Sequence, residues 1–263
     1  MGIVLFTVPG EAQMRFANSL YRQTGGGLSL VIVQKTKKKS FLQRTFRFFR
    51  RNSWHTFLEL WYALLLRKEH QVRGALEYFR EIDPMDNSEN SSKFKILEVE
   101  SVNTDAVYEI IRKISPRLIV VWGGPLLKPN IIKNAQRAIN LHFGLCPYYR
   151  GALANQHAVM RDDFSKIGAT VLFINGKPDA GEIVATVEAD TSLPPRELFL
   201  DLNNRAAAKY LEVATKIYLG KTVQAVSQEA VKNKTLLRKS WTPKTRYMLG
   251  KKILEWEKEF ENR

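Results

Sequence analysis

Short apolar runs alternate with segments of helical spacing along most of the chain. Residues 3–8 form an apolar run, residues 11–24 carry apolar side chains at helical spacing, and residues 28–33 form a second apolar run. This order predicts a strand–helix–strand unit and therefore a parallel sheet. The glycines at 25–27 follow the helix rather than precede it, so they predict a helix end and a turn, not a phosphate-binding loop.

The same alternation returns between residues 95 and 220. The expected strands cover residues 95–99, 118–122, 138–141, 168–174 and 183–187, and the expected helices cover 104–114, 152–161 and 195–219, with a loop and short helix at 126–137. A strand at 223–226 and a last helix around 248–260 are expected after them. The pattern predicts an α/β fold with a mostly parallel sheet flanked by helices.

Residues 35–92 interrupt this alternation. Residues 35–80 have mostly helical, amphipathic spacing with basic side chains between aromatic ones, and residues 83–93 are polar and turn-rich. Three interpretations of 35–80 stay open: a packing insertion that covers a sheet edge or a dimer partner, a peripheral membrane contact, and a nucleic-acid contact. We expect a helical basic insertion at about 35–92.

The composition is that of a globular protein with excess positive charge. Of 263 residues, 44% are hydrophobic and 25% charged, which excludes disorder, collagen and coiled coil as descriptions of the whole chain. The formal net charge of +15 indicates an anionic partner. Residues 35–80 hold 12 basic and 3 acidic side chains and residues 221–263 hold 11 and 5, whereas 81–220 are balanced. Recognition by bulk charge would therefore use those two flanking segments.

Cysteine content and hydropathy bear on location. Cys146 is the only cysteine, so no intrachain disulfide can form. The apolar run at 57–66 contains Glu59 and is too short to span a bilayer, and the first residues make a poor signal peptide. We expect a soluble, cytoplasmic protein, with peripheral attachment to the inner membrane surface as an alternative.

Candidate chemistry gathers in two polar segments that follow predicted strands. Asn140 and His142 are two residues apart at a strand end and so point to the same side. Asp179 lies in a loop rich in glycine and proline at 175–182. Loops at one edge of an α/β sheet open onto a common crevice, so the three side chains can meet. Taken singly, these residues more often have a structural role: a histidine beside an asparagine is commonly a satisfied strand end, and a lone aspartate in such a loop is commonly a turn-former.

Together, the motifs resemble those of a known family. The pattern Asn-x-His-x-x-Leu-x-Pro-x-Tyr-Arg-Gly at 140–151, with Asp-Ala-Gly-Glu-Ile at 179–183, resembles the folate-dependent formyltransferases. These include methionyl-tRNA formyltransferase, glycinamide ribonucleotide formyltransferase and sugar-nucleotide N-formyltransferases. The resemblance runs over residues 2–220 without 35–92. It implies a Rossmann-like formyltransferase fold, with a catalytic domain at 1–220 and a short C-terminal extension at 221–263.

The resemblance also implies a site. The implied catalytic residues are Asn140, His142 and Asp179, the folate-binding residues Trp122, Gly124, Leu126, Leu127, Ile174 and Asn175, and the substrate-binding residues Tyr149, Arg150 and Gly151. The implied formyl donor is 10-formyltetrahydrofolate, and no metal is implied. Asn140 and protonated His142 can donate hydrogen bonds to the tetrahedral oxyanion of formyl transfer. Asp179 can hold His142 in its useful tautomer or relay a proton through water. We interpret Cys146 as a packing residue.

The amine acceptor stays open. The tRNA enzymes of the family carry a C-terminal β-barrel domain for which residues 221–263 are too few, so we expect an anionic amino sugar, nucleotide- or lipid-linked. The alternatives are a formyl-folate hydrolase, a tRNA formyltransferase-like enzyme, and a basic protein of the same fold that binds nucleic acid or membrane. The apolar insertion could also serve as the interface of a homodimer.

Overall fold

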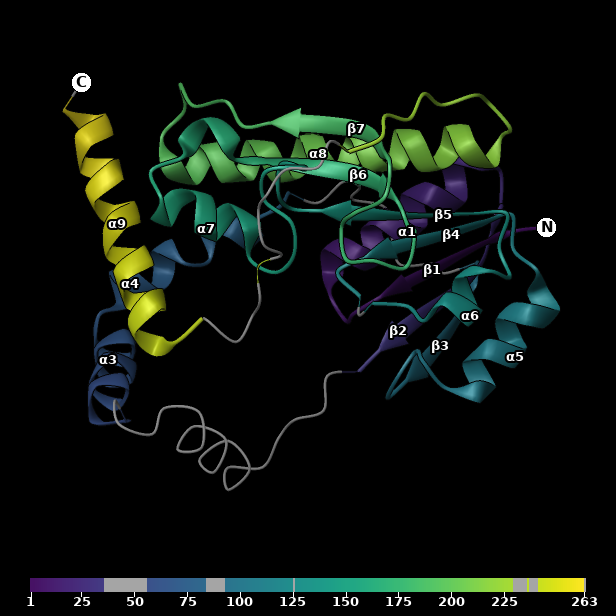
Figure 1. Ribbon diagram of the computed structural model, residues 1–263, viewed down its shortest axis with the longest axis horizontal. Coiled ribbons are helices and arrows are strands. Elements are labelled where there is room, and N and C mark those ends of the chain that lie inside the picture. Colours follow the sequence, from purple (N-terminus) through teal and green to yellow (C-terminus); the bar gives the residue numbers. More distant parts are fainter. Residues whose placement is uncertain (36–55, 84–92, 125, 229–235, 237–240, 263) are drawn as a thin grey trace.

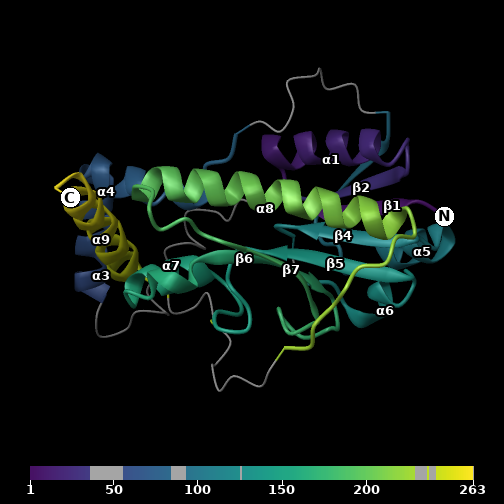
Figure 2. The same cartoon turned by 90° about the horizontal axis from the view of Figure 1, so that it is seen from above.

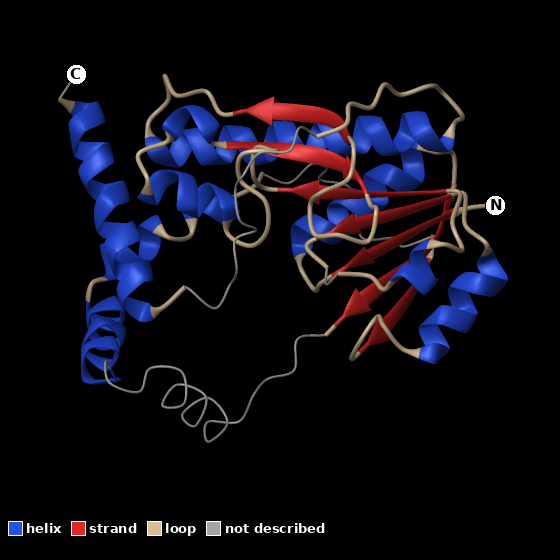
Figure 3. Ribbon diagram, viewed as in Figure 1, coloured by secondary structure: helices blue, strands red, loops and turns tan. Residues whose placement is uncertain are grey.

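A computed structural model describes residues 1–35, 56–83, 93–124, 126–228, 236 and 241–262. These residues form a seven-stranded sheet in the order β3-β2-β1-β4-β5-β6-β7 (Figure 3). The strands are β1 (Ile3–Thr7), β2 (Leu28–Gln34), β3 (Lys95–Val99), β4 (Leu118–Trp122), β5 (Arg137–His142), β6 (Gly168–Phe173) and β7 (Ile183–Glu188). All pairings from β3 across to β5 are parallel, whereas β5–β6 and β6–β7 are antiparallel. The expected mostly parallel sheet is confirmed, with an antiparallel edge that the sequence did not predict.

Helices cover both faces of the sheet (Figures 1 and 2). The longer helices are α1 (Glu11–Gln23), α3 (Thr56–Lys68), α5 (Asp105–Ile114), α8 (Pro195–Tyr218) and α9 (Pro243–Glu261). The shorter ones are α4 (His70–Ala75), η2 (Tyr78–Arg80), α6 (Pro129–Ile132), α7 (Ala154–Met160) and η3 (Phe164–Lys166). Strands buried on both faces need apolar side chains at nearly every position, which explains the continuous apolar runs of β1 and β4.

The two faces of the sheet belong to separate hydrophobic clusters. Odd-numbered residues of β1 and even-numbered residues of β4 pack with α1 and α8, whereas even-numbered residues of β1 and odd-numbered residues of β4 pack on the opposite face. Leu5 and Val120, for example, lie in the α1/α8 cluster, while Phe6 and Val121 lie with α5 and α6. The alternation of side chains along each strand thus divides the core into two layers.

Tyr210 ties α8 to the centre of the sheet. Its ring is fully buried, and its hydroxyl accepts a hydrogen bond from the Val121 amide at 3.0 Å. The same hydroxyl lies 2.9 Å from the Val121 carbonyl oxygen and 3.0 Å from that of Ile139, the two acceptors for its proton. One side chain therefore fixes β4 against β5, the strand that carries Asn140.

The helices of the insertion contact the helix of the C-terminal extension. Helices α3, α4 and α9 pack together beside α7, on the side of the molecule toward which the parallel strands point (Figure 1). The helical insertion is thus observed for 56–80, while 36–55 and 84–92 lie outside the described residues. The strand expected at 223–226 was wrong: only Val226 pairs, in an isolated antiparallel bridge to Ile183.

Candidate active site

Strand β5 presents Asn140 and His142 on one side of the sheet. Its neighbour β6 runs antiparallel, with Asn140 opposite Leu172 and His142 opposite Thr170. Asn140 is half-buried, whereas only 7% of the His142 side chain is exposed. The i,i+2 spacing that the sequence offered therefore places the amide at the surface of the site and the imidazole behind it.

The loop between β6 and β7 brings Asp179 to these two residues. Because β6 is antiparallel to β5, it ends at Phe173 opposite Ile139, and the loop that follows comes back to contact Asn140 of β5. Gly181 permits this close return, since a Cβ there would lie 1.6 Å from the Phe173 carbonyl oxygen. Asp179 itself has φ of 47°, in the left-handed region.

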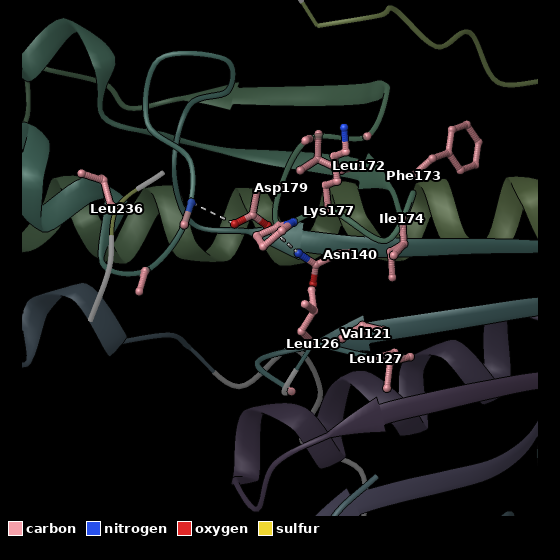
Figure 4. Close-up of a pocket in the computed structure, with 16 residues that line it drawn as sticks. Val121, Leu126, Leu127, Asn140, Leu172, Phe173, Ile174, Lys177, Asp179 and Leu236 are labelled. Carbon is pink, nitrogen blue, oxygen red and sulfur yellow. Dashed lines mark hydrogen bonds between the residues drawn. The ribbon is translucent and has the colours of Figure 1, made fainter. Parts of the chain in front are cut away.

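The Asp179 carboxylate is the centre of the cluster (Figure 4). Its Oδ1 accepts a hydrogen bond from Asn140 Nδ2 at 3.3 Å, and its Oδ2 accepts one from the Gly151 amide at 3.0 Å. The same Oδ2 lies 3.5 Å from Nδ1 of His142. The structure thus brings Asn140, His142 and Asp179 together, although Asp179 lies 37 positions after His142 in the sequence.

A backbone carbonyl defines the protonation of one His142 nitrogen. His142 Nε2 lies 2.8 Å from the carbonyl oxygen of Tyr149, which can only accept, so Nε2 carries a proton. Nδ1 is then the nitrogen that faces the Asp179 carboxylate and can exchange a proton with it. The sequence had assigned the choice of tautomer to Asp179, whereas in the structure the Tyr149 carbonyl makes it.

Small residues and hydroxyls shape the turn beneath the imidazole. A Cβ at Gly144 would lie 2.4 Å from His142 Nε2 and 2.3 Å from the Ala154 Cβ, so no larger residue fits there. The Thr170 hydroxyl donates to the Gly144 carbonyl at 2.7 Å and accepts from the Cys146 amide at 3.0 Å. Burial, together with the nearby Asp179 carboxylate, raises the pKa of the Cys146 thiol to about 12, so this thiol is not a nucleophile at neutral pH.

A cavity of about 420 Å³ opens beside Asn140 and Asp179 (Figure 4). Its apolar wall is formed by Val121, Leu126, Leu127, Leu172, Phe173 and Ile174. At its other end lie Gly151, Ala152 and Leu236, and Lys177 contributes a basic group. This size and mixture of apolar wall and few polar groups are typical of small-molecule sites.

The residues expected to bind folate divide into two groups. Gly124, Leu126, Leu127 and Ile174 line the cavity. The Trp122 ring is instead buried against Phe16, with ring centroids 4.8 Å apart. Asn175 is exposed and stabilises its own loop, since its Nδ2 donates to the Ala180 carbonyl at 2.9 Å.

The three residues expected to bind substrate also differ in position. Gly151 lines the cavity and donates to Asp179. The Tyr149 side chain is buried away from it, with its hydroxyl donating to Asp163 Oδ2 at 2.9 Å. Arg150 Nε donates to Gln228 Oε1 at 2.8 Å.

Two residues of the C-terminal extension belong to the site and were not anticipated. Leu236 lines the cavity and forms a parallel bridge with Gly151. Gln228 contacts both the Arg150 side chain and the backbone of the Asp179 loop. Nothing in the sequence distinguished this glutamine from other polar residues of the segment.

The fold and the cluster define a class: an α/β protein whose amide, carboxylate and imidazole meet beside a small-molecule cavity. Residues 30–213, more than half of the chain, match the model of the formyl transferase family. The chain therefore belongs to the formyl transferase family, as its sequence motifs had indicated.

Relatives by sequence are methionyl-tRNA formyltransferases. The enzyme of Syntrophomonas wolfei is 26% identical over 178 residues, which cover 63% of this chain and 56% of that one. The enzyme of Chlorobium luteolum is 35% identical over 91 residues, which cover 34% of this chain and 29% of that one. The chain thus spans about half the length of the first of these relatives and less than a third of the second.

Solved structures of formyltransferases share the fold. A sugar N-formyltransferase from Shewanella sp. has a TM-score of 0.54 and 14% identity, and the match covers 90% of this chain and 76% of that one. The N-formyltransferase from Helicobacter canadensis, in complex with folinic acid and dTDP-3-aminofucose, has a TM-score of 0.54 and 11% identity over 92% of this chain and 72% of its own. The phosphoribosylglycinamide formyltransferase from Coxiella burnetii has a TM-score of 0.52 and 14% identity, and the match covers 85% of this chain and 90% of that one.

Within the part of the chain that the structure describes, no helix combines the length and the apolar character needed to span a bilayer.

Proposed function

We infer that the protein is an N-formyltransferase that moves the formyl group of 10-formyltetrahydrofolate to a primary amine. The observation that carries this conclusion is the convergence of Asn140, Asp179 and His142 beside a cavity, in a chain of the formyl transferase family. Formyl transfer develops an oxyanion and releases a proton from the amine. It therefore needs a fixed hydrogen-bond donor and a proton acceptor, and this cluster holds both.

The roles of the three side chains follow from their positions. Asn140 Nδ2 has two protons, one shared with Asp179 and one available to the oxyanion, and such a donor is worth about 3 kcal/mol of barrier. Asp179 lines the cavity and accepts the proton of the attacking amine. His142 Nδ1, 3.5 Å behind it, receives that proton in turn. The amine nitrogen bonds to the formyl carbon, the bond from that carbon to N10 breaks, and N10 takes up a proton.

The cavity suits the formyl donor. A flat pterin ring matches the apolar wall between the loop after β4 and the loop after β6, and the backbone amides and carbonyls of those loops can pair with its polar edge. Gly124 in the first loop leaves the backbone open to such an approach. Donor binding by Gly124, Leu126, Leu127 and Ile174 is thus part of the proposal.

We place an amino sugar, nucleotide- or lipid-linked, as the acceptor. Support comes from the shared fold with sugar N-formyltransferases and from the basic Lys177 at the cavity, which can pair with a phosphate. The acceptor end is then the part of the cavity formed by Gly151, Ala152 and Leu236. Initiator tRNA is the alternative that the relatives by sequence favour.

Release of tetrahydrofolate tests the proposal. The protein is incubated with 10-formyltetrahydrofolate and, separately, a panel of amino-sugar nucleotides, initiator methionyl-tRNA, or no acceptor. Turnover that requires an amino sugar supports the proposal, whereas acceptor-independent release indicates a hydrolase and tRNA-dependent release a tRNA enzyme. His142→Ala should remove turnover without unfolding the chain. Absence of turnover and of folate binding in every arm would sink the enzymatic conclusion.

We also propose that the protein is a cytoplasmic enzyme held at the inner membrane surface through helix α3. Phe57, Trp61 and Leu64 are 89%, 60% and 51% exposed and are spaced along one side of the helix. Such a stripe beside basic residues is typical of helices that lie on anionic membranes. The alternative role of this stripe is an interface between two copies of the chain, and vesicle sedimentation together with light scattering distinguishes the two roles.

A further inference from the structure

One glutamine side chain of the C-terminal extension joins the two loops of the candidate site. Gln228 Nε2 donates to the Asp179 carbonyl at 3.0 Å and to the Gly181 carbonyl at 2.7 Å. Its Oε1 accepts from Arg150 Nε at 2.8 Å. Both protons of the amide and its oxygen are therefore used between the loop that carries Asp179 and the loop that carries Arg150.

The backbone that Gln228 contacts is unusual. Asp179 has φ of 47°, a left-handed conformation that is unfavourable for a residue with a side chain and persists where the surroundings impose it. The Gln228 amide holds this residue from its carbonyl side, while the Gly151 amide holds its carboxylate. The carboxylate lies 3.5 Å from His142 Nδ1, just beyond ordinary hydrogen-bond length, so a small displacement decides whether the two exchange a proton.

We propose that Gln228 is a positioning residue, which keeps the Asp179 carboxylate between Asn140, the Gly151 amide and His142. The inference rests on the proposed formyl transfer and assigns a role within it to a residue outside the motifs at 140–151 and 179–183. An amide is needed at this position, because a carboxylate could still accept from Arg150 but has no proton to donate to the two carbonyls.

The segment that carries Gln228 has an independent anchor. Val226 and Ile183 exchange backbone hydrogen bonds of 2.8 and 2.9 Å, so the segment stays paired with β7 when the Gln228 side chain is removed. The chain also offers a matched control. Gln224, four residues earlier, is exposed in the same segment, and its replacement changes the same chemical group away from the site.

The test compares Gln228→Ala, Gln228→Glu and Gln224→Ala in the full chain. The first readout is the ¹⁵N spectrum of the histidine rings across a pH titration, with the His142 signals identified by their loss in His142→Ala. Both Gln228 variants should shift the His142 signals, while His70, His157 and the Gln224→Ala spectrum stay as in the wild type. This readout needs no substrate, so it remains decisive even if the protein proves not to transfer formyl groups.

The second readout is steady-state turnover. Both Gln228 variants should lower kcat about 10- to 100-fold with KM for the formyl donor within about threefold, because misplacement of a reacting group by an ångström acts on the chemical step. Wild-type His142 signals and kcat in Gln228→Ala would overturn the proposal, as would full activity in Gln228→Glu. A large fall in Tm of Gln228→Ala, together with shifts of the His70 and His157 signals as well as those of His142, would also overturn it, since the glutamine would then have a general structural role.

Discussion

Asp179 is the residue at which the hydrogen bonds of the candidate site converge. Its carboxylate accepts from Asn140 and from the Gly151 amide while facing His142. Asp179→Asn preserves the shape but removes the proton acceptor, so kcat should fall about 10²- to 10⁴-fold. Measurement of tetrahydrofolate release checks this, with Asp201→Asn on the surface of α8 as the control. Undiminished turnover in Asp179→Asn would remove the carboxylate from the mechanism.

Cys146 gives a pH dependence with a defined sign. Burial raises its pKa from 9.0 to about 12, so between these values the unfolded thiol loses its proton while the folded one keeps it. The free energy of unfolding should therefore fall as the pH rises from 9 toward 12. Cys146→Ala should show a smaller fall over that interval, measured by urea unfolding at several pH values. Identical pH profiles for variant and wild type would contradict the buried, protonated thiol.

The sequence predicted part of the site at this scale. Side-chain alternation was sufficient to place Asn140 and His142 on one side of a strand, and the structure places them there. The return of Asp179 depended on the family resemblance, because β6 is antiparallel and its loop turns back across the strand instead of leaving from a shared edge. Gln228 could not be predicted, since its side chain bonds to the backbone carbonyls of Asp179 and Gly181, which lie 49 and 47 positions earlier in the sequence.

At the scale of elements, helix α8 determines how β4 and β5 sit together. The buried Tyr210 hydroxyl serves one amide and two carbonyls of these strands. Tyr210→Phe leaves the Val121 amide without this partner and should cost about 1–3 kcal/mol of unfolding free energy. Urea unfolding measures the loss, with the half-buried Tyr108→Phe on α5 as the control. Equal stability of the two variants would show that the hydroxyl contributes nothing to the sheet.

Elements were predicted well where apolar runs are continuous or strongly periodic. The strand at Leu118–Trp122 has the predicted bounds because it is buried on both faces and can be nothing else. Residues 223–226 are also mostly apolar, yet only Val226 pairs, because apolar composition alone does not supply a partner strand. The antiparallel direction of β6 also left no local signal, since strand direction is set by connections and not by composition.

At the scale of the whole molecule, the insertion and the C-terminal extension form one helical layer. Glu59 of α3 accepts from the Lys244 amide at the start of α9 at 2.9 Å, and the Tyr62 and Tyr247 rings lie 5.3 Å apart. The division into a catalytic domain at 1–220 and an extension at 221–263 stays a prediction. Its parts nevertheless touch closely, which sequence periodicity cannot reveal because it carries no information on contacts between distant helices.

The exposed side of α3 carries the proposed membrane contact, and its composition gives a testable prediction. Glu59 is the only acidic residue within 56–68 and is buried, so within 57–68 the exposed side is apolar and ends in the basic Arg67 and Lys68. Phe57→Ser with Trp61→Ser should abolish sedimentation with anionic vesicles. Arg67→Gln with Lys68→Gln should weaken sedimentation at low salt and have little effect at high salt, where the charges are already screened. Neutral vesicles should retain little protein. If no variant or wild type sediments with vesicles, but the wild type forms a dimer by light scattering that Phe57→Ser with Trp61→Ser dissociates, the stripe is a subunit interface and the membrane assignment is wrong.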